Sequence, residues 1–185
     1  MTGRRWTRRL VFALSMLAIA AGTHPTTAAA QSVSVGDLLF TVPVTILPTG
    51  PGSSTESGGL RLGQGWQWAG RTAGATPLPS TLVLARADLA ATDAGEVLGL
   101  VLSGSAAGML PDLRLSNRRT RPMPGSGDQT RLSLQYSPGP GVTYHGEILI
   151  AARPARPAAL LVVLGDEELT AATADSILES ARWRS

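Results

Sequence analysis

The sequence predicts an α+β sandwich, in which a mostly antiparallel sheet of about six strands is flanked by two main helices. Three observations lead to this fold class. Most apolar segments alternate apolar and polar residues, as half-buried strands do. Turns rich in Pro and Gly separate these segments at short intervals. Two other segments repeat their apolar residues at helical spacing, and one of them ends the chain.

The first thirty residues predict a cleavable export signal. A basic start with four arginines precedes an apolar run from Leu10 to Gly22, and residues 28–30 (Ala-Ala-Ala) form a cleavage pattern ahead of Gln31. The apolar run is shorter than the ~20 residues that span a membrane, and Pro25 closes it. The pair at residues 8–9 (Arg-Arg) matches the twin-arginine pattern, so the general secretory route and the twin-arginine route both stay open.

Removal of this signal changes what the charge of the chain implies. The whole chain has 16 basic and 13 acidic residues, but four of the basic ones lie in the signal, which leaves twelve. Residues 31–185 are therefore nearly neutral, and they lack the basic excess that predicts nucleic-acid binding. The absence of cysteine excludes disulfides, thiolate metal sites and a lipid-anchoring cysteine. We expect one domain over residues 31–185, long enough to bury a single core.

The first part of this domain predicts strands joined by a long loop. Residues 31–47 alternate as a strand, and Pro43 and Pro48 restrict its pairing and place it near a sheet edge. Residues 49–59 contain no apolar side chain and predict a flexible loop. Another strand is expected over residues 60–69.

The middle of the domain predicts one helix and a series of hairpin strands. The helix begins after Thr92 or Asp93, has Glu96 in its first turn, and continues to the region of Gly104. Strand patterns cover residues 81–87, 112–121, 130–136, 142–152 and 158–164. Residues 158–164 are apolar on both faces, which predicts a central strand.

The chain ends in a second predicted helix over residues 170–183. Its apolar stripe consists of Ala174, Ile177, Leu178 and Ala181, at the spacing that one helix face requires. Acidic residues precede this stripe and arginines follow it, as the helix dipole favours.

A family resemblance rests on the order of motifs in the C-terminal half. These motifs are residues 127–129, residues 144–147 (Tyr-His-Gly-Glu), the apolar strand 160–164 and the terminal Ile-Leu-Glu-Ser-Ala-Arg at 177–182. The order resembles that of the PsbP-like and LpqN-like α/β/α sandwiches. That family includes exported bacterial proteins, photosystem accessory subunits and a nuclear import factor, so the resemblance implies a binding or accessory module without naming a ligand. The chain departs from many bacterial relatives because it lacks the lipid-anchoring cysteine.

Two groups of residues are candidates for a ligand or partner face. Arg118, Arg119 and Arg121, with Arg131 on the next strand, could bind an anion, because guanidinium groups suit phosphate and carboxylate. Glu147 and Asp128 are alternative partners for these arginines within the fold. Trp66 and Trp68 are expected on one face of an extended strand, where they could stack on a sugar or peptide or fill the core.

His145 is the one histidine that remains after cleavage, and the alternative function, that of a hydrolase, depends on it. A hydrolase would have to use His145 with Glu147 or a serine, but the chain has no Gly-x-Ser-x-Gly motif. An exposed histidine on a strand is the simpler interpretation. The acidic residues 166–168 precede a helix, where carboxylates stabilise the N-terminus without a metal.

We therefore expect an exported, non-enzymatic binding or accessory module of the bacterial cell envelope, with a hydrolase as the alternative. A structural protein of the cell surface is a third, weaker option. No metal and no cofactor is expected. The partner is an envelope protein or cell-wall ligand rather than nucleic acid, and cleavage leaves no membrane span. The sequence does not fix the oligomeric state.

Overall fold

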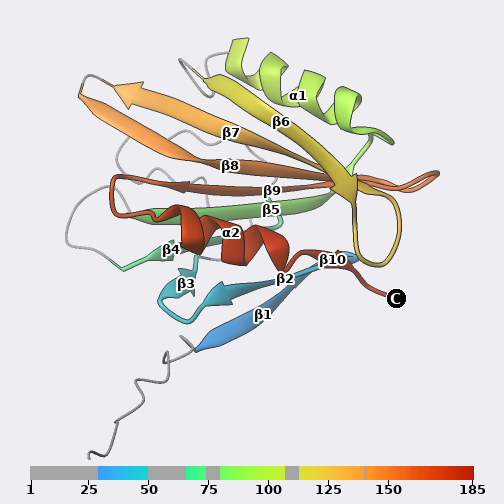
Figure 1. Cartoon of the computed structure of the whole chain (residues 1–185), viewed down its shortest axis with the longest axis horizontal. Helices are drawn as coiled ribbons and strands as arrows, with labels where there is room; N and C mark the ends of the chain where they lie inside the picture. The colour runs from blue at the N-terminus through green and yellow to red at the C-terminus, as the bar shows by residue number, and fades with distance from the viewer. Residues whose placement is uncertain (1–28, 50–65, 74–79, 107–112, 140) are drawn as a thin grey trace, which may run out of the picture.

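The computed structural model describes residues 29–49, 66–73, 80–106, 113–139 and 141–185 (Figure 1). The predicted signal lies almost wholly outside these residues, and so does the predicted loop 49–59 apart from Thr49. The described part of the chain holds two helices and ten strands. The helices are α1 (Ala94–Ala106) and α2 (Ala171–Glu179); the strands are β1 (Ala30–Val35), β2 (Leu38–Pro43), β3 (Ile46–Pro48), β4 (Trp68–Thr72), β5 (Thr81–Leu89), β6 (Arg114–Pro122), β7 (Asp128–Gly139), β8 (Val142–Ala152), β9 (Ala158–Gly165) and β10 (Arg182–Trp183).

The strands form two antiparallel sheets. The large sheet has seven strands in the order β3-β4-β5-β9-β8-β7-β6, and the small sheet has the order β1-β2-β10. The predicted class of two helices with a mostly antiparallel sheet is confirmed, but the sheets are larger than the expected six strands. β9 lies in the middle of the large sheet and all its residues are buried, as the run of apolar residues predicts.

The large sheet is covered on both faces. One face packs against α2 and the small sheet, through residues such as Leu149 and Leu161 of the sheet and Ile177 of α2. The opposite face packs against α1 through Ile148, Val162 and the helix residue Val97. Figure 1 shows α2 in front of the large sheet, with the small sheet below it. Strand alternation sends successive side chains to these two cores.

The prediction of one strand over residues 31–47 is wrong. The chain turns at Gly36, whose φ of 54° lies in the left-handed region that glycine favours, and β1 pairs with β2 as a hairpin. A further break separates β2 from β3, which joins the edge of the large sheet. The expected edge position therefore holds for the segment that contains Pro48.

Both helices begin at predicted positions. Asp93 Oδ1 accepts hydrogen bonds from the backbone N–H groups of Gly95 (2.6 Å) and Glu96 (3.0 Å), so Asp93 caps α1. Thr170 caps α2 by accepting from the N–H of Thr173 at 3.2 Å. No helix in the described residues is long and apolar enough to cross a membrane.

The second helix is shorter than predicted. α2 ends at Glu179, and the next residues form β10, which pairs with β2. Ser180 Oγ donates to the carbonyl of Ile177 at 2.6 Å and accepts from the N–H of Thr41 at 2.8 Å. Trp183 is thereby turned into the core, where it is buried. Burial of this indole explains why the chain leaves the helix early.

Candidate functional site

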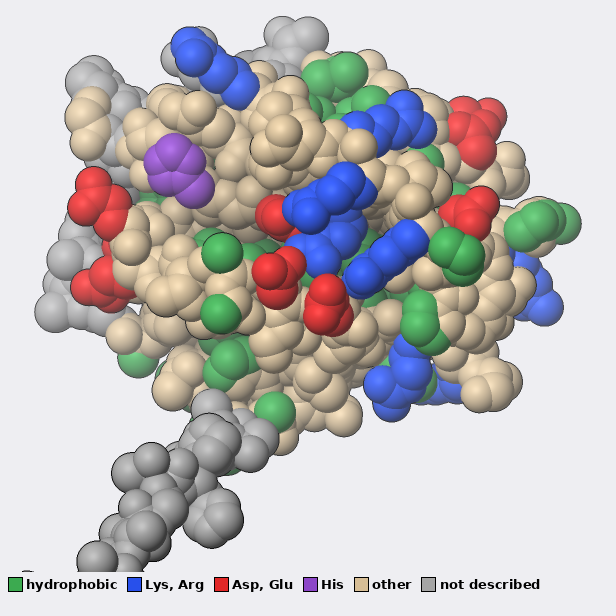
Figure 2. Space-filling model, in the orientation of Figure 1, with side chains coloured by type: hydrophobic (Ala, Val, Ile, Leu, Met, Phe, Trp, Pro, Cys, Tyr) green, Lys and Arg blue, Asp and Glu red, His purple; other side chains and the backbone are tan. Residues whose placement is uncertain are grey.

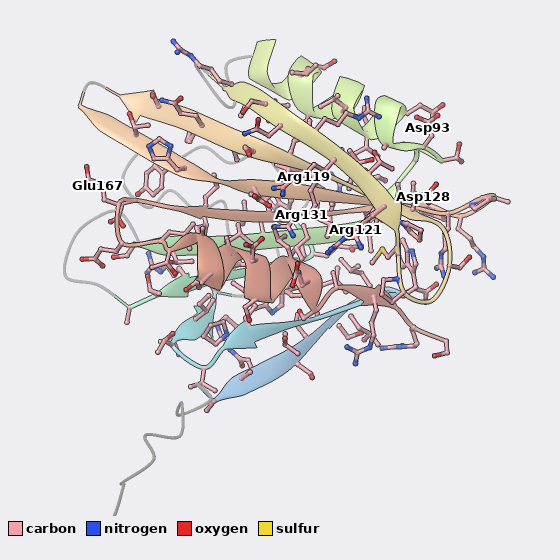
Figure 3. All side chains as sticks on the ribbon, in the orientation of Figure 1. Asp93, Arg119, Arg121, Asp128, Arg131 and Glu167 are labelled. Carbon is pink, nitrogen blue, oxygen red and sulfur yellow. The ribbon has the colours of Figure 1, made fainter. Side chains whose placement is uncertain are left out.

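The polar site lies on the α2-facing side of the large sheet, over strands β6, β7 and β8. The register opposes Arg119 to Arg131, Arg131 to Leu149, and Ser133 to Glu147. Because side chains alternate along each strand, Arg119, Arg131 and Glu147 all project from this one face. Figure 2 shows arginine side chains gathered on this face with carboxylates beside them, and Figure 3 shows Arg119, Arg121 and Arg131 between β6 and α2.

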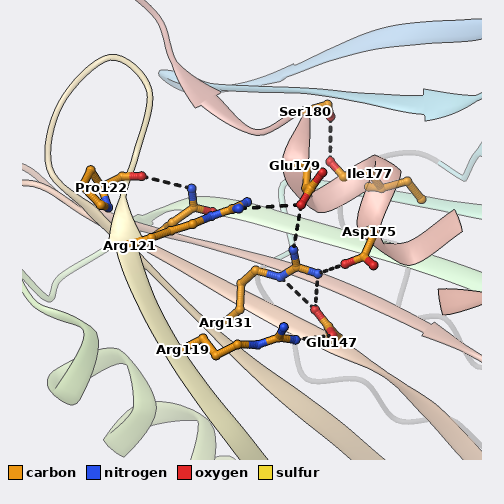
Figure 4. A network of polar contacts seen from close by, with 10 residues as sticks. Arg119, Arg121, Pro122, Arg131, Glu147, Asp175, Ile177, Glu179 and Ser180 are labelled. Carbon is orange, nitrogen blue, oxygen red and sulfur yellow. Dashed lines mark hydrogen bonds and ion pairs between the residues drawn. The ribbon is translucent and has the colours of Figure 1, made fainter. Parts of the chain in front are cut away.

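Arg131 is the centre of an ion-pair network that joins the sheet to α2. Its side chain is only 7% exposed, and its Nε donates to Glu147 Oε2 at 2.8 Å. The same guanidinium donates to Asp175 of α2 and lies 3.8 Å from Glu179 Oε1. A guanidinium has five N–H donors, so several carboxylates can pair more of them than a single carboxylate could (Figure 4).

Two more arginines lie on the rim of this network. Arg119 Nη2 lies 3.3 Å from Glu147 Oε1, and Arg121 Nη1 lies 3.6 Å from Glu179 Oε1 (Figure 4). The side chain of Arg119 is 67% exposed and that of Arg121 is 47% exposed. Exposed ion pairs of this kind contribute only about 0–1 kcal/mol. The rim arginines can therefore exchange these contacts for others.

The electrostatics of Arg131 follow from its partners. Burial by itself lowers the pKa of the guanidinium, but the hydrogen bonds to Asp175 and Glu147 and their negative charges outweigh it, so the pKa is raised. Three arginines face three carboxylates across the network, which leaves it balanced. Arg131 and Glu147 therefore hold α2 against the sheet and are not open ligand groups.

Arg118 lies apart from the network. The register of β6 against β7 shifts between Ser116 and Arg119, which places Asn117 and Arg118 in a bulge. Asn117 has a φ of 53°, which is uncommon for a residue other than glycine. Arg118 is exposed and, within the described part of the chain, has no ion pair.

The two tryptophans do not form one surface, contrary to the prediction. Trp66 packs against the core on the α1 side, and Trp68 packs against the core on the α2 side. The prediction fails because β4 begins only at Trp68, so Trp66 is not part of the strand. Trp68 meets Phe40 edge to face, with ring centroids 5.6 Å apart. Its ring also covers Gly70, where an added Cβ would lie 2.4 Å from the indole.

His145 is exposed near the start of β8, opposite Gln135 of β7 and Gly165 of β9. It shares a sheet face with Glu147, which is engaged by Arg131. Among the residues that the structure describes, no hydrogen bond joins His145 to a serine or a carboxylate, and no group of three or more His, Asp or Glu residues could hold a metal ion. Asp166 instead accepts from the N–H of Glu168 at 2.9 Å.

Two acidic residues of the network, both on α2, were not among the predicted site residues. Asp175 and Glu179 lie four residues apart on α2, next to the apolar stripe, so both project from the rim of the buried helix face. That spacing is the signal that could have identified them. Glu147 pairs with the arginines as one alternative foresaw, whereas the described structure gives Asp128 no ion pair with them.

Comparison with known proteins supports the fold and nothing finer. No family model matches the chain, and no curated protein matches it. The chain is similar to the solution structure of cyanobacterial PsbP (CyanoP) from Synechocystis sp. PCC 6803, with a TM-score of 0.57 and 13% sequence identity. The match covers 90% of this chain and 98% of that protein. Identity this low bears on the fold alone, and the chain has a PsbP-like fold.

Proposed function

We propose that the chain is an exported, non-enzymatic binding or accessory module of the bacterial cell envelope, and that it binds its partner through β6 and the exposed arginines of this strand. The single observation that carries this proposal is the composition and exposure of β6. The strand has four arginines and no acidic residue, and Leu115 is the one position in it that is partly buried rather than exposed. Arg114 and Arg118 have no ion pair among the described residues, so this exposed strand has an excess of positive charge.

The rest of the site supports a binding role for β6 and not for the buried network. Arg131 is buried and already paired with carboxylates, so it is poorly accessible to a ligand. Arg119 and Arg121 hold single exposed contacts, and Arg118 holds none in the described structure. Exposed charged groups at an interface determine the rate of association and the choice of partner. Trp66 and Trp68 pack against the cores, which leaves the arginines as the main recognition groups.

The hydrolase alternative has less support. Hydrolysis by His145 would require a nucleophile or a second acid within about 3 Å of its ring. The nearest acid along the same strand, Glu147, is held by Arg131 and Arg119. Ser133 lies opposite Glu147 in the register and not opposite His145.

A capture experiment tests the binding role. The tagged chain is incubated with envelope extract of the native organism, next to the double variant Arg118→Gln/Arg119→Gln. The matched control is Arg156→Gln/Arg182→Gln, which removes the same charge from two exposed positions outside β6. We expect a partner that the wild type and the control retain and the β6 variant loses. Equal recovery by all three proteins, or recovery of nothing above background, contradicts the proposal.

Export is tested separately on the full chain expressed in a bacterium. Intact-mass analysis of the protein outside the cytoplasm is expected to find an N-terminus at Gln31. The variant Arg8→Lys/Arg9→Lys distinguishes the two routes, because the twin-arginine route depends on the arginine pair. Full-length protein confined to the cytoplasm would contradict export by either route.

A further inference from the structure

We propose that β6 binds an extended acidic segment of the partner protein by adding it as the next strand of the large sheet. This inference deepens the proposed function and rests on it. The carboxylates of the added strand would face the arginines of β6, and its backbone would pair with the open edge. The mode of binding is strand addition, in which backbone hydrogen bonds give affinity and side chains give specificity.

The first support is the edge itself. Among the residues that the structure describes, β6 is the last strand of the seven-stranded sheet and pairs only with β7. It is nine residues long, and eight of those residues are exposed. A strand at a sheet edge has backbone N–H and C=O groups on its outer side that are not used by the sheet. The bulge at Asn117 and Arg118 divides this edge, so a partner strand has to shift its register there and pairs most regularly along residues 119–122.

The second support is the charge, which selects the kind of strand that can pair. Two copies of β6 laid edge to edge would oppose arginine to arginine, so self-association is disfavoured. Pairing with an acidic strand is favoured, because a carboxylate can then lie opposite a guanidinium, with the Cβ atoms of the two residues about 5 Å apart. The four arginines thus exclude a second copy and favour an acidic partner.

The third support is the spacing. Arg119 and Arg121 lie on one face of β6, two residues apart, in the part of the ladder that follows the bulge. A partner with acidic residues at i and i+2 therefore presents both carboxylates to this face. The present contacts of Arg119 and Arg121 are to Glu147 and Glu179, which Arg131 also contacts. Both rim arginines can turn to a partner without leaving those carboxylates unpaired.

The test measures the binding of labelled nine-residue peptides to the purified chain by fluorescence anisotropy. The first peptide alternates Glu with Thr and Val. The second has the same composition with all its glutamates in one block, and the third is the first with alternate backbone nitrogens methylated. We expect the first to bind with a Kd of about 10 µM and the other two at least about tenfold more weakly. Arg119→Gln/Arg121→Gln is expected to weaken the first peptide about tenfold, and Arg156→Gln/Arg182→Gln to leave it unchanged.

Four outcomes overturn the inference. If all three peptides bind equally, the arginines attract negative charge without strand pairing. The chain could instead bind vesicles made of phosphatidylcholine and phosphatidylglycerol in equal parts. If that binding requires the β6 arginines and no peptide binds, then β6 is a lipid-binding surface. Absence of peptide binding, together with an arginine-dependent partner in the capture experiment, would leave the proposed function standing and reject strand addition. Failure of both experiments would reject the two proposals together.

Discussion

Arg131 is the centre of the polar contact between α2 and the large sheet. Replacing it with Met keeps much of the volume but leaves Glu147, 18% exposed, without its main cation. We expect Arg131→Met to lower the free energy of unfolding by about 2 kcal/mol, less than for a fully buried pair because Asp175 is half exposed. Urea unfolding measures this change. Arg118→Met, at an exposed position that has no ion pair within the described residues, is the control and should change stability by less than about 0.5 kcal/mol. Equal effects would contradict the role of the network.

The pKa of Arg131 determines when this residue loses its charge. Its pKa is raised above the ordinary value of an arginine, so the guanidinium stabilises the fold fully below that ordinary value. This contribution is lost only as pH rises through the raised value. Titration of Arg131 therefore cannot release α2 at any pH near neutrality.

Tyr144 gives a sharper pH prediction. Tyr144 and Tyr136 lie opposite each other on β8 and β7, and both are buried. Burial, followed by the charge of Asp166 and the neighbouring Tyr136, raises the pKa of Tyr144 to about 12 from 10.0. Stability from the neutral phenol is complete below pH 10 and is lost as pH rises toward 12.

Spectrophotometric titration of the phenols tests this expectation. The native protein should ionise Tyr144 near pH 12, whereas the denatured chain should ionise both tyrosines near pH 10. The free energy of unfolding should fall by about 2 kcal/mol between pH 10 and pH 12. Tyr144→Phe should remove most of this pH-dependent loss. Ionisation of both native phenols near the ordinary value would contradict this account of the core.

At the level of the elements, Gly146 of β8 and Gly99 of α1 allow a comparison between a crowded and an open position. An added Cβ at Gly146 would lie 1.8 Å from the carbonyl oxygen of Val163, so Gly146→Ala must push β8 away from β9. We expect a loss of more than about 3 kcal/mol in urea unfolding, or failure to fold. Gly99 on α1 has nothing within 4 Å of the same position. Gly99→Ala should therefore stabilise the fold by up to about 1 kcal/mol. Similar effects at both positions would contradict the close packing of the two strands.

The elements also show what local sequence could predict. The hairpin of β7 and β8, the central β9 and the starts of both helices follow from alternation, continuous apolar runs and capping residues. Local patterns could not predict β10, because the helical stripe continues to Ala181 and Trp183 leaves the helix only to enter a core made by distant segments. In the site, alternation placed Arg131 and Glu147 near the other arginines. Their contact with Asp175 depends on how α2 lies on the sheet, which spacing along the chain does not determine.

On the scale of the whole molecule, the C-terminus joins segments that are far apart in the sequence. The N–H of Trp183 donates to the carbonyl of Pro124 at 3.1 Å, and the guanidinium of Arg153 lies 4.2 Å from the centre of the Trp183 ring. Arg153 also pairs with Asp37 in the turn after β1. The small sheet, the β6–β7 loop and the β8–β9 loop are thereby held at one end of the large sheet.

We expect Trp183→Ala to destabilise the whole protein and not the small sheet alone. Trp183 is 2% exposed, and loss of a buried indole lowers stability by about 3–5 kcal/mol. Because the small sheet, α2 and one face of the large sheet share a single core, backbone circular dichroism and tryptophan fluorescence should follow one coincident urea transition at lower midpoint. Arg182→Ala, at the exposed neighbouring position, should leave the midpoint nearly unchanged. Separate transitions for the two probes would show that β1, β2 and β10 unfold independently of the large sheet.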